Sequence, residues 1–243
     1  MAVLHNKTVG LSANCVLIRR DGYESAIEDT AAPIHDRRGQ VTGAVIVFHD
    51  VGVARAMSLR MSYLAQHDFL TELPNRLLLN DRLTQAMASA HRHGKSLALL
   101  FLDVDHFKHI NDSLGHASGD QLLRSIAQRL VTCVRSSDTV SRQGGDEFVV
   151  LLSEVAHARD VAFTADKVLA ALSRPHRIGD QDLNATVSVG IAVYPIDGAG
   201  AETLLKNADL ALFHAKAHGR SNRQFFGPNM GVRTVDLRSE ATI

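Results

Sequence analysis

Short apolar runs alternate with polar turns at the start of the chain. Residues 14–50 contain NCVLIRR, YESAIEDTAAPI and VTGAVIVFHD, separated by Asp21-Gly22 and by HDRRGQ. Asp-Gly favours a tight turn, and β-branched residues dominate the third run. The pattern predicts a three-stranded antiparallel segment. Three strands cannot cover both faces of a sheet unaided, so this segment needs a partner surface.

Residues 51–67 contain helix-forming residues and no proline. Ala54, Met57, Met61 and Leu64 recur at the three-four spacing of a coiled-coil seam. Two heptads leave two readings open. One is a linker helix that pairs with a second copy of the chain, and the other is an amphipathic helix packed on its own domain.

Helical and strand patterns alternate between residues 68 and 226. The continuous apolar run at 97–102 is typical of a strand buried on both faces, and Gly144-Gly145 indicates a hairpin turn within 139–152. Gly119-Asp120 is expected to cap a helix. Further strands are expected at 176–178 and 185–194, and helices at 77–90, 121–134, 158–172 and 201–218. Because strands join through hairpins as well as helices, we expect an α+β fold with a mostly antiparallel sheet flanked by helices.

Composition narrows the functional classes. The chain has 243 residues, 26 Lys and Arg against 26 Asp and Glu, and 45% hydrophobic residues. The length fits one full domain plus a fragment. The equal numbers of basic and acidic residues exclude a nucleic-acid binder that works by neutralising phosphates. No apolar window is long enough for a membrane span, and the first residues lack a signal-peptide core. With only Cys15 and Cys133, we expect a cytoplasmic protein without a disulfide framework.

Two segments carry the candidate chemistry. In FLDVDHFK (101–108), Asp103 follows six apolar residues, so its carboxylate needs a cation or water at the end of the strand. In GGDEF (144–148), two glycines allow a sharp turn and close approach of a ligand beside Asp146 and Glu147. If the two strands are adjacent, these carboxylates form an oxygen cluster suited to Mg²⁺ completed by phosphates and water.

Five motifs in this order resemble the GGDEF family of diguanylate cyclases. The resemblance covers 67–226 and implies a palm-like nucleotidyl-cyclase fold that joins two GTP molecules into cyclic di-GMP, releasing two pyrophosphates. A non-catalytic module that binds GTP or cyclic di-GMP in a sensor protein is the alternative. The motifs are HDFLTELPNR (67–76), FLDVDHFKHINDSLGHASGDQLL (101–123), RSSDTVSRQGGDEFVVLL (135–152), SVGIAVYPIDG (188–198) and LLKNADLALFHAKAHGRSN (204–222).

The resemblance implies a role for each matching residue. Asp103, Asp146 and the Val104 carbonyl would hold Mg²⁺ or Mn²⁺, and Glu147 would complete that site and help to deprotonate the attacking 3′-hydroxyl. Asn111 and Asp120 would read guanine, whose donor pair adenine lacks. The triphosphate would be bound by Lys108, Lys216, Arg220, the backbone amides of His106 and Phe107, and the turn at Gly144 and Gly145.

A second site is implied by Arg135 and Asp138. An RxxD at this distance before Gly144 resembles the family's inhibitory site for product, since Arg offers a planar fork to phosphate or guanine and Asp accepts from guanine. Three positions depart from the family pattern: Glu72 replaces a usual Gly, Phe213 a common Tyr, and Gln143 an apolar or aromatic residue. None of these removes a metal-binding, base-reading or phosphate-binding group.

The flanks of the chain complete the domain prediction. RRDGYE (19–24), API (32–34) and VFHDV (47–51) resemble the last three strands of a PAS domain. We therefore expect a partial PAS-like segment at 1–50, a linker helix at 51–67, a GGDEF domain at 68–226 and a tail at 227–243. The tail resembles the connector to an EAL domain, which suggests a fragment of a longer sensor. Because the product needs two nucleotides, a homodimer through the linker helix and the PAS-like segment is expected.

Overall fold

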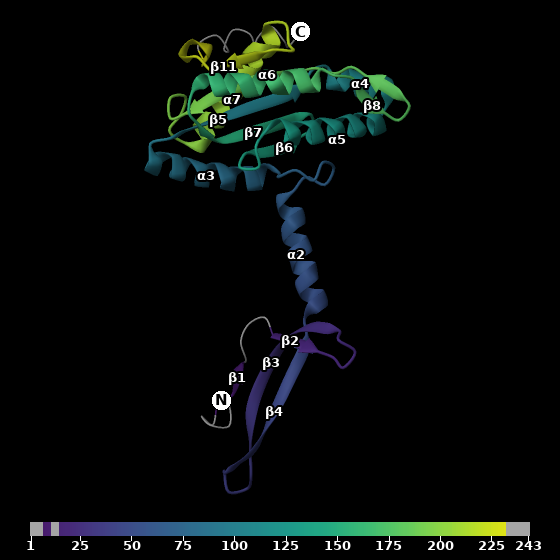
Figure 1. The fold of residues 1–243 in the computed structure, drawn as a ribbon, viewed down its shortest axis with the longest axis vertical. Helices are drawn as coiled ribbons and strands as arrows, with labels where there is room; N and C mark the ends of the chain where they lie inside the picture. Colours follow the sequence, from purple (N-terminus) through teal and green to yellow (C-terminus); the bar gives the residue numbers. More distant parts are fainter. Residues whose placement is uncertain (1–6, 11–14, 232–243) are drawn as a thin grey trace, which may run out of the picture. The chain divides into compact units, whose positions relative to one another are not determined.

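The computed structural model describes residues 7–10 and 15–231 in two compact units, Met1–Ala65 and Gln66–Ile243 (Figure 1). Asn14, where the first predicted strand begins, and most of the predicted tail lie outside the described residues. No helix in the described part of the chain has the length and apolar character that crossing a bilayer requires.

The first unit is an antiparallel sheet followed by a helix. Its elements are β1 (Val9–Gly10), β2 (Cys15–Ile18), β3 (Glu24–His35), β4 (Val41–Asp50) and α2 (Gly52–Gln66). β1 and β2 pair with one edge of β3, and β4 pairs with the other. The prediction of three strands was therefore short by β1, whose two residues are too few to give a pattern. The Asp21-Gly22 turn is confirmed, with Gly22 at φ 83°.

This sheet has almost no core of its own. Ala31 is the one buried hydrophobic residue among the described residues of the first unit. α2 buries none of its side chains, and Met57, Met61 and Leu64 of the predicted seam are exposed. The apolar surface that we expected to need a partner is therefore exposed to solvent within this unit.

The second unit contains the predicted alternation of helices and strands. Its elements are α3 (Arg76–His93), β5 (Ser96–Val104), α4 (Phe107–Leu114), α5 (His116–Cys133), β6 (Thr139–Gly144), β7 (Glu147–Val155), α6 (Ala158–Leu172), β8 (His176–Ile178), β9 (Gln181–Leu183), β10 (Val187–Tyr194), α7 (Ala201–Ala217), β11 (Arg223–Phe225) and the 3₁₀ turn η1 (Pro228–Gly231).

The central sheet of this unit has the order β11-β10-β5-β7-β6. The pairs β10–β5, β5–β7 and β6–β7 are antiparallel, but β10–β11 is parallel. The sheet is therefore mixed, with mostly antiparallel pairs as expected. The parallel pair was not predicted, because the three residues of β11 show no strand periodicity. β8 and β9 form a separate hairpin.

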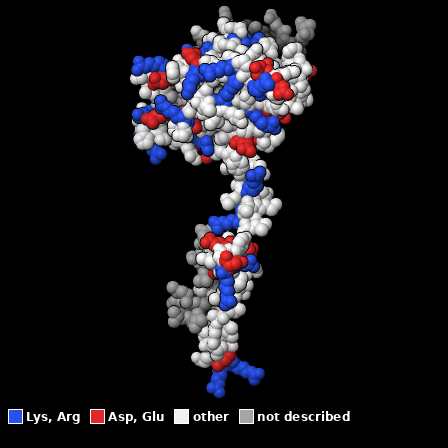
Figure 2. Space-filling model, turned by 45° about the vertical axis from the view of Figure 1, so that its right-hand side comes forward, with Lys and Arg blue, Asp and Glu red and all other residues white. Residues whose placement is uncertain are grey.

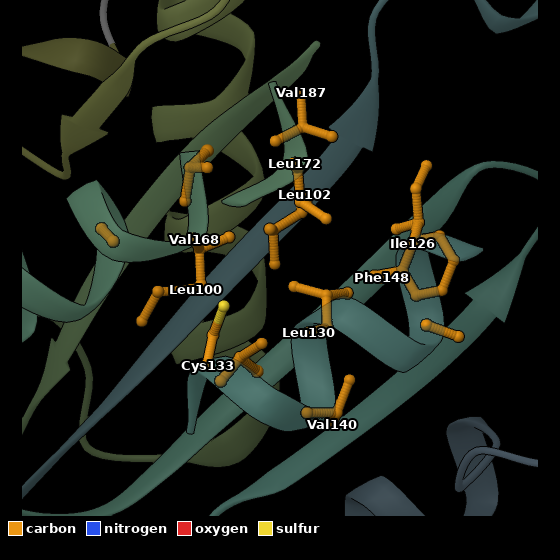
Figure 3. Packing of buried hydrophobic residues seen from close by; sticks show 14 of the residues in the cluster. Leu100, Leu102, Ile126, Leu130, Cys133, Val140, Phe148, Val168, Leu172 and Val187 are labelled. Atoms are coloured by element: carbon orange, nitrogen blue, oxygen red, sulfur yellow. The ribbon is translucent and has the colours of Figure 1, made fainter. Parts of the chain in front are cut away.

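Helices cover both faces of this sheet. Successive residues of β5 point to opposite faces: Leu100 and Leu102 pack with α5 and α6, whereas Leu97 and Leu99 pack with α3 and α7. Figure 3 shows the first of these cores, in which Leu100, Phe148, Leu130 and Val168 come from different elements. The two buried cores, one on each face of the sheet, thus hold β5 in place.

Helix boundaries were only partly predicted. α5 begins at His116 after Gly115 at φ 81°, several residues before the predicted start, so Gly119 and Asp120 lie inside the helix and do not cap it. By contrast, Asn75 of the LPNR motif caps α3 by accepting from the backbone amides of Leu77 and Leu78.

Candidate active site

The predicted carboxylates converge where β5 meets the β6–β7 turn. Asp103, the penultimate residue of β5, is paired in register with Glu147, the first residue of β7. The backbone amide of Val104 donates to the Asp146 carbonyl at 3.4 Å. The turn requires glycine, since Gly144 and Gly145 have φ values of 135° and 53°. Two motifs separated by about forty residues of sequence thus form one site.

Negative charge is concentrated at this site. Asp103 is only 9% exposed, and its carboxylate lies 2.8 Å from the Nζ of Lys216 on α7. Burial, Asp146 and Asp105 raise the pKa of Asp103 even though Lys216 opposes the shift. Burial, with Asp103, Asp209 and Asp146, also raises the pKa of Glu147. A cation bound here would relieve this repulsion.

The donor set fits a hard divalent cation that also needs ligands from elsewhere. Carboxylate and carbonyl oxygens suit Mg²⁺, which usually keeps water and phosphate ligands as well. In the described parts of the chain, no three acidic, His or Cys side chains are gathered to hold a metal by themselves. The protein oxygens at Asp103, Val104 and Asp146 therefore fit a cation whose shell a phosphorylated ligand completes.

The two predicted guanine readers come from adjacent helices. Asn111 lies on α4, and its Oδ1 is a buried oxygen without a hydrogen-bond partner in the described residues. Gly119 of α5 is needed beside it, because a Cβ there would overlap the Asn111 amide. Asp120 follows Gly119 and is exposed. An unpaired buried acceptor is costly, and a donor from a bound ligand would satisfy it.

Basic groups and amides are available for phosphate at the same end of the sheet. Lys216 contacts Asp103, and the exposed Lys108 lies in the first turn of α4. His106, at φ 59°, forms the N-cap of that helix, so the Phe107 amide is at its N-terminus. Arg220 is exposed, and its guanidinium has no hydrogen bond or ion pair to any described residue.

Asp105 is a residue of the site that sequence reasoning missed. It is buried and accepts hydrogen bonds from the hydroxyls of Thr186 and Ser188, both at 2.7 Å, and from the Ser221 amide at 3.1 Å. It therefore ties the end of β5 to β10 and to the loop that carries Arg220. The DVD pattern contains this second carboxylate, but its distant partners leave no signal in the sequence.

Arg142 is the second missed residue. Its guanidinium donates to both carboxylate oxygens of Asp68 at 2.8 and 2.9 Å, and to the Gly145 carbonyl at 2.7 and 3.1 Å. Burial opposes ionisation of Asp68, but hydrogen bonds from Thr71 and Arg142 outweigh it and lower the pKa of Asp68. The turn at Gly144 and Gly145 is thus braced, through Arg142, by the segment that follows α2.

Arg135 and Asp138 lie at the opposite end of the β6–β7 hairpin, beyond the Thr139–Leu151 pair. The Asp138 carboxylate accepts from the backbone amides of Arg135 at 3.1 Å and Ser153 at 3.2 Å. A hollow of about 470 Å³ opens beside them. Its lining includes Arg135, Asp138, Phe163, Thr164 and Lys167.

The surface of the second unit carries both signs of charge. Figure 2 shows Lys and Arg interspersed with Asp and Glu on the visible face. This agrees with the formal net charge of zero and gives no single-sign field for a polyanion such as nucleic acid.

Comparison with known proteins identifies relatives of the second unit. Residues 65–222 match the family described as "Diguanylate cyclase, GGDEF domain". The bifunctional diguanylate cyclase/cyclic di-GMP phosphodiesterase MucR of Pseudomonas aeruginosa is 46% identical over 173 residues, 71% of this chain and 25% of MucR. The diguanylate cyclase TpbB of the same species is 42% identical over 165 residues, 68% of this chain and 38% of TpbB. The chain thus spans a quarter to two fifths of the length of these relatives.

Solved structures agree in fold. The GGDEF domain of TpbB aligns with a TM-score of 0.67 at 42% identity, covering 68% of this chain and 97% of that structure. The coiled coil and GGDEF domain of DgcB from Caulobacter crescentus, in complex with c-di-GMP, aligns with a TM-score of 0.66 at 30% identity, covering 72% of this chain and 93% of that structure.

Proposed function

The chain belongs to the family of diguanylate cyclase GGDEF domains, and from that premise we propose that its second unit condenses two GTP molecules into cyclic di-GMP and releases two pyrophosphates. The observation that carries the proposal is the pairing of Asp103 with Glu147 beside Asp146 at a turn of two glycines. The residues that the family motifs assign to metal, base and phosphate are all present in this sequence, which supports the proposal.

Asp103, Asp146 and the Val104 carbonyl would hold Mg²⁺ or Mn²⁺. The metal supplies charge neutralisation for the triphosphate and for the leaving pyrophosphate. Glu147 lies next to this set, paired in register with Asp103, where its carboxylate would accept the proton of the 3′-hydroxyl. Lys216, now paired with Asp103, would bind phosphate together with Lys108 and Arg220.

Base selection rests on Asn111 and Asp120. The unpaired Oδ1 of Asn111 would accept from guanine, and the exposed Asp120 carboxylate would accept from the N1–H and the 2-amino group. Adenine has no such donor pair, so both acceptors would stay unsatisfied. The amides of His106 and Phe107 and the turn at Gly144 and Gly145 would lie along the phosphates.

Nucleotide selectivity tests this assignment. With Mg²⁺, the protein should consume GTP and leave ATP unchanged, and a tenfold excess of ATP should not slow GTP consumption. Asn111→Ala should raise the KM for GTP by about tenfold, the effect of one lost hydrogen bond to a buried group. Equal use of ATP and GTP would refute the roles of Asn111 and Asp120.

We also propose that Arg135 and Asp138 bind the product. The adjacent hollow could admit a nucleotide base, with Arg135 free to pair with phosphate and Asp138 held in place by two backbone amides. The DgcB structure is described as a complex with c-di-GMP, which supports product binding in the family. Binding at this distance from the carboxylates would inhibit through the placement of two domains.

Two copies are needed, since one domain offers one GTP site and the product contains two nucleotides. We propose that the PAS-like strands and α2 hold the homodimer. The exposed Met57, Met61 and Leu64 on α2 support this arrangement, as do the uncovered strands of the first unit. The rate per molecule should then rise with protein concentration in the dilute range.

A further inference from the structure

A buried carboxylate stands beside the proposed metal site without belonging to it. Asp105 is 5% exposed, and both of its oxygens are engaged. Oδ1 accepts from Ser188, and Oδ2 accepts from Thr186 and from the backbone amide of Ser221. A buried carboxylate is tolerated when donors satisfy it, and here the donors come from β10 and from the loop after α7.

That loop has an unusual backbone. Arg220 and Ser221 have φ values of 58° and 49°, a conformation that costs energy for residues other than glycine. The Arg220 amide donates to the Ala215 carbonyl at 3.2 Å, and the Asn222 amide group donates to the carbonyls of Ala215 and Arg220 at 2.8 and 2.9 Å. The Ser221–Asp105 bond is the contact that joins this strained pair to the catalytic end of β5.

The Arg220 side chain contrasts with its backbone. Its guanidinium is exposed and is not used by any hydrogen bond or ion pair to the described residues, whereas the backbone around it is held on three sides. Because its backbone is held in place and its guanidinium has no partner among the described residues, Arg220 is suited to bind an anionic ligand.

We propose that Asp105 is a positioning residue for nucleotide binding, which holds the left-handed Arg220–Ser221 backbone so that Arg220 reaches the triphosphate. This rests on the proposed function only in taking GTP as the ligand of Arg220. For this role, the position of the Asp105 carboxylate matters and its charge does not, because the carboxylate acts as the hydrogen-bond acceptor for the Ser221 amide.

Two substitutions separate position from charge. Asp105→Asn removes the charge, but its oxygen can still accept from Ser221 and Thr186 while its amide donates to Ser188. Asp105→Glu keeps the charge and displaces the carboxylate by one methylene. Binding is measured by calorimetry with Mg²⁺ and α,β-methylene GTP, which cannot release pyrophosphate. We expect a Kd within about threefold of the unmodified protein for Asp105→Asn and about tenfold weaker for Asp105→Glu.

Combining Asp105→Glu with Arg220→Ala tests whether Asp105 affects nucleotide binding through Arg220. Arg220→Ala should weaken binding by about tenfold in the unmodified protein and by less than about twofold in Asp105→Glu, because the arginine is already misplaced there. Ser188→Ala is the matched control: it removes a buried hydrogen bond to the same carboxylate without touching the Ser221 bond, and Kd should stay unchanged. If Asp105→Glu does not fold, Asp105→Ser, whose hydroxyl is too short to reach Ser221, takes its place.

Each outcome decides a separate point. Equal weakening by Asp105→Asn and Asp105→Glu, or independent effects of Asp105→Glu and Arg220→Ala, would overturn the positioning role. An unmodified protein that binds the analogue but makes no cyclic dinucleotide from GTP would contradict the proposed function and leave the positioning role intact. An unmodified protein that does not bind the analogue would contradict both.

Discussion

Strands β4 and β7 have similar apolar content and opposite surroundings. In β4, Ile46 and Phe48 are 59% and 54% exposed, whereas in β7 Phe148 and Val150 are 1% and 0% exposed. The difference comes from the helices: α5 and α6 cover one face of the β7 sheet and α3 and α7 the other, but no residue of α2, the helix of the first unit, is buried. Strand pattern alone thus specifies a sheet, and packing decides whether that sheet can support a site.

The same contrast separates the chemistry of the two units. In the second unit, two cores hold β5 and β7 in register, so that Asp103 and Glu147 are brought together at one end. The first unit has the exposed apolar surface of an interaction module. This contrast supports the proposal that the second unit carries catalysis and the first carries assembly.

The largest effect should come from the carboxylates of the second unit. Asp103→Asn or Asp146→Asn should lower turnover of GTP by about 10³-fold, since a neutral amide does not balance the charge of the metal. Far-UV circular dichroism should be unchanged. Asp81→Asn, an exposed aspartate on α3, is the control and should keep full activity. Product formation at the unmodified rate by either site variant would disprove the metal assignment.

One substitution in a strand of each sheet, Leu100→Ala on β5 and Ile46→Ala on β4, tests the difference in burial between the two sheets. Leu100→Ala should lower the free energy of unfolding by about 2–5 kcal/mol, because Leu100 is fully buried between the sheet and α5 and α6. Ile46→Ala should change it by less than about 0.5 kcal/mol in the monomer, where Ile46 is exposed, and by more at protein concentrations where the proposed homodimer forms. Urea unfolding provides both values. A small cost for Ile46→Ala at every protein concentration would contradict the proposal that a second copy covers the sheet.

Arg135→Ala should change the time course and leave the initial rate nearly unaltered. In the unmodified protein, the rate should fall severalfold as product accumulates, because the proposed inhibitory site is distinct from the carboxylates. The variant should run on at its initial rate with GTP in excess. Arg174→Ala, which removes an arginine outside the hollow, should slow like the unmodified protein. Identical progress curves for all three proteins would exclude Arg135 from feedback.

The smallest effect concerns the stability cost of the site. Because the pKa of Asp103 is raised, the folded protein holds this proton more tightly than the unfolded chain does, and its stability falls as pH rises above about 4. Asp103→Asn should therefore match the unmodified protein near pH 3.5 and have the higher Tm at pH 7.5, both without metal. A lower Tm at pH 7.5 would mean that the ion pair with Lys216 outweighs the repulsion.

Long elements and contiguous motifs were predictable from the sequence. The apolar run of β5 and the helices α3, α6 and α7 follow from periodicity, and the glycine turn follows from its dipeptide. β1 and β11 have two and three residues, too few for a period, and exist because a neighbouring strand pairs with them. The start of α5 was misplaced because Gly115, which separates it from α4, resembles any other loop glycine.

The supporting contacts of the site could not be predicted. Asp105 meets Ser221 across 116 residues, and Arg142 meets Asp68 across 74. Such partners are chosen by the fold and not by local spacing. Motif resemblance therefore finds the groups proposed to touch the ligand, whereas the groups that hold them in place emerge only from the structure.

The most direct test of the central claim is the identity and ratio of the products. The full chain is incubated with GTP and Mg²⁺, and the products are separated by chromatography and identified by mass spectrometry. The account predicts cyclic di-GMP with two pyrophosphates for each molecule formed. Absence of cyclic di-GMP, or release of GDP and phosphate in place of pyrophosphate, would contradict the assignment of the second unit as a diguanylate cyclase.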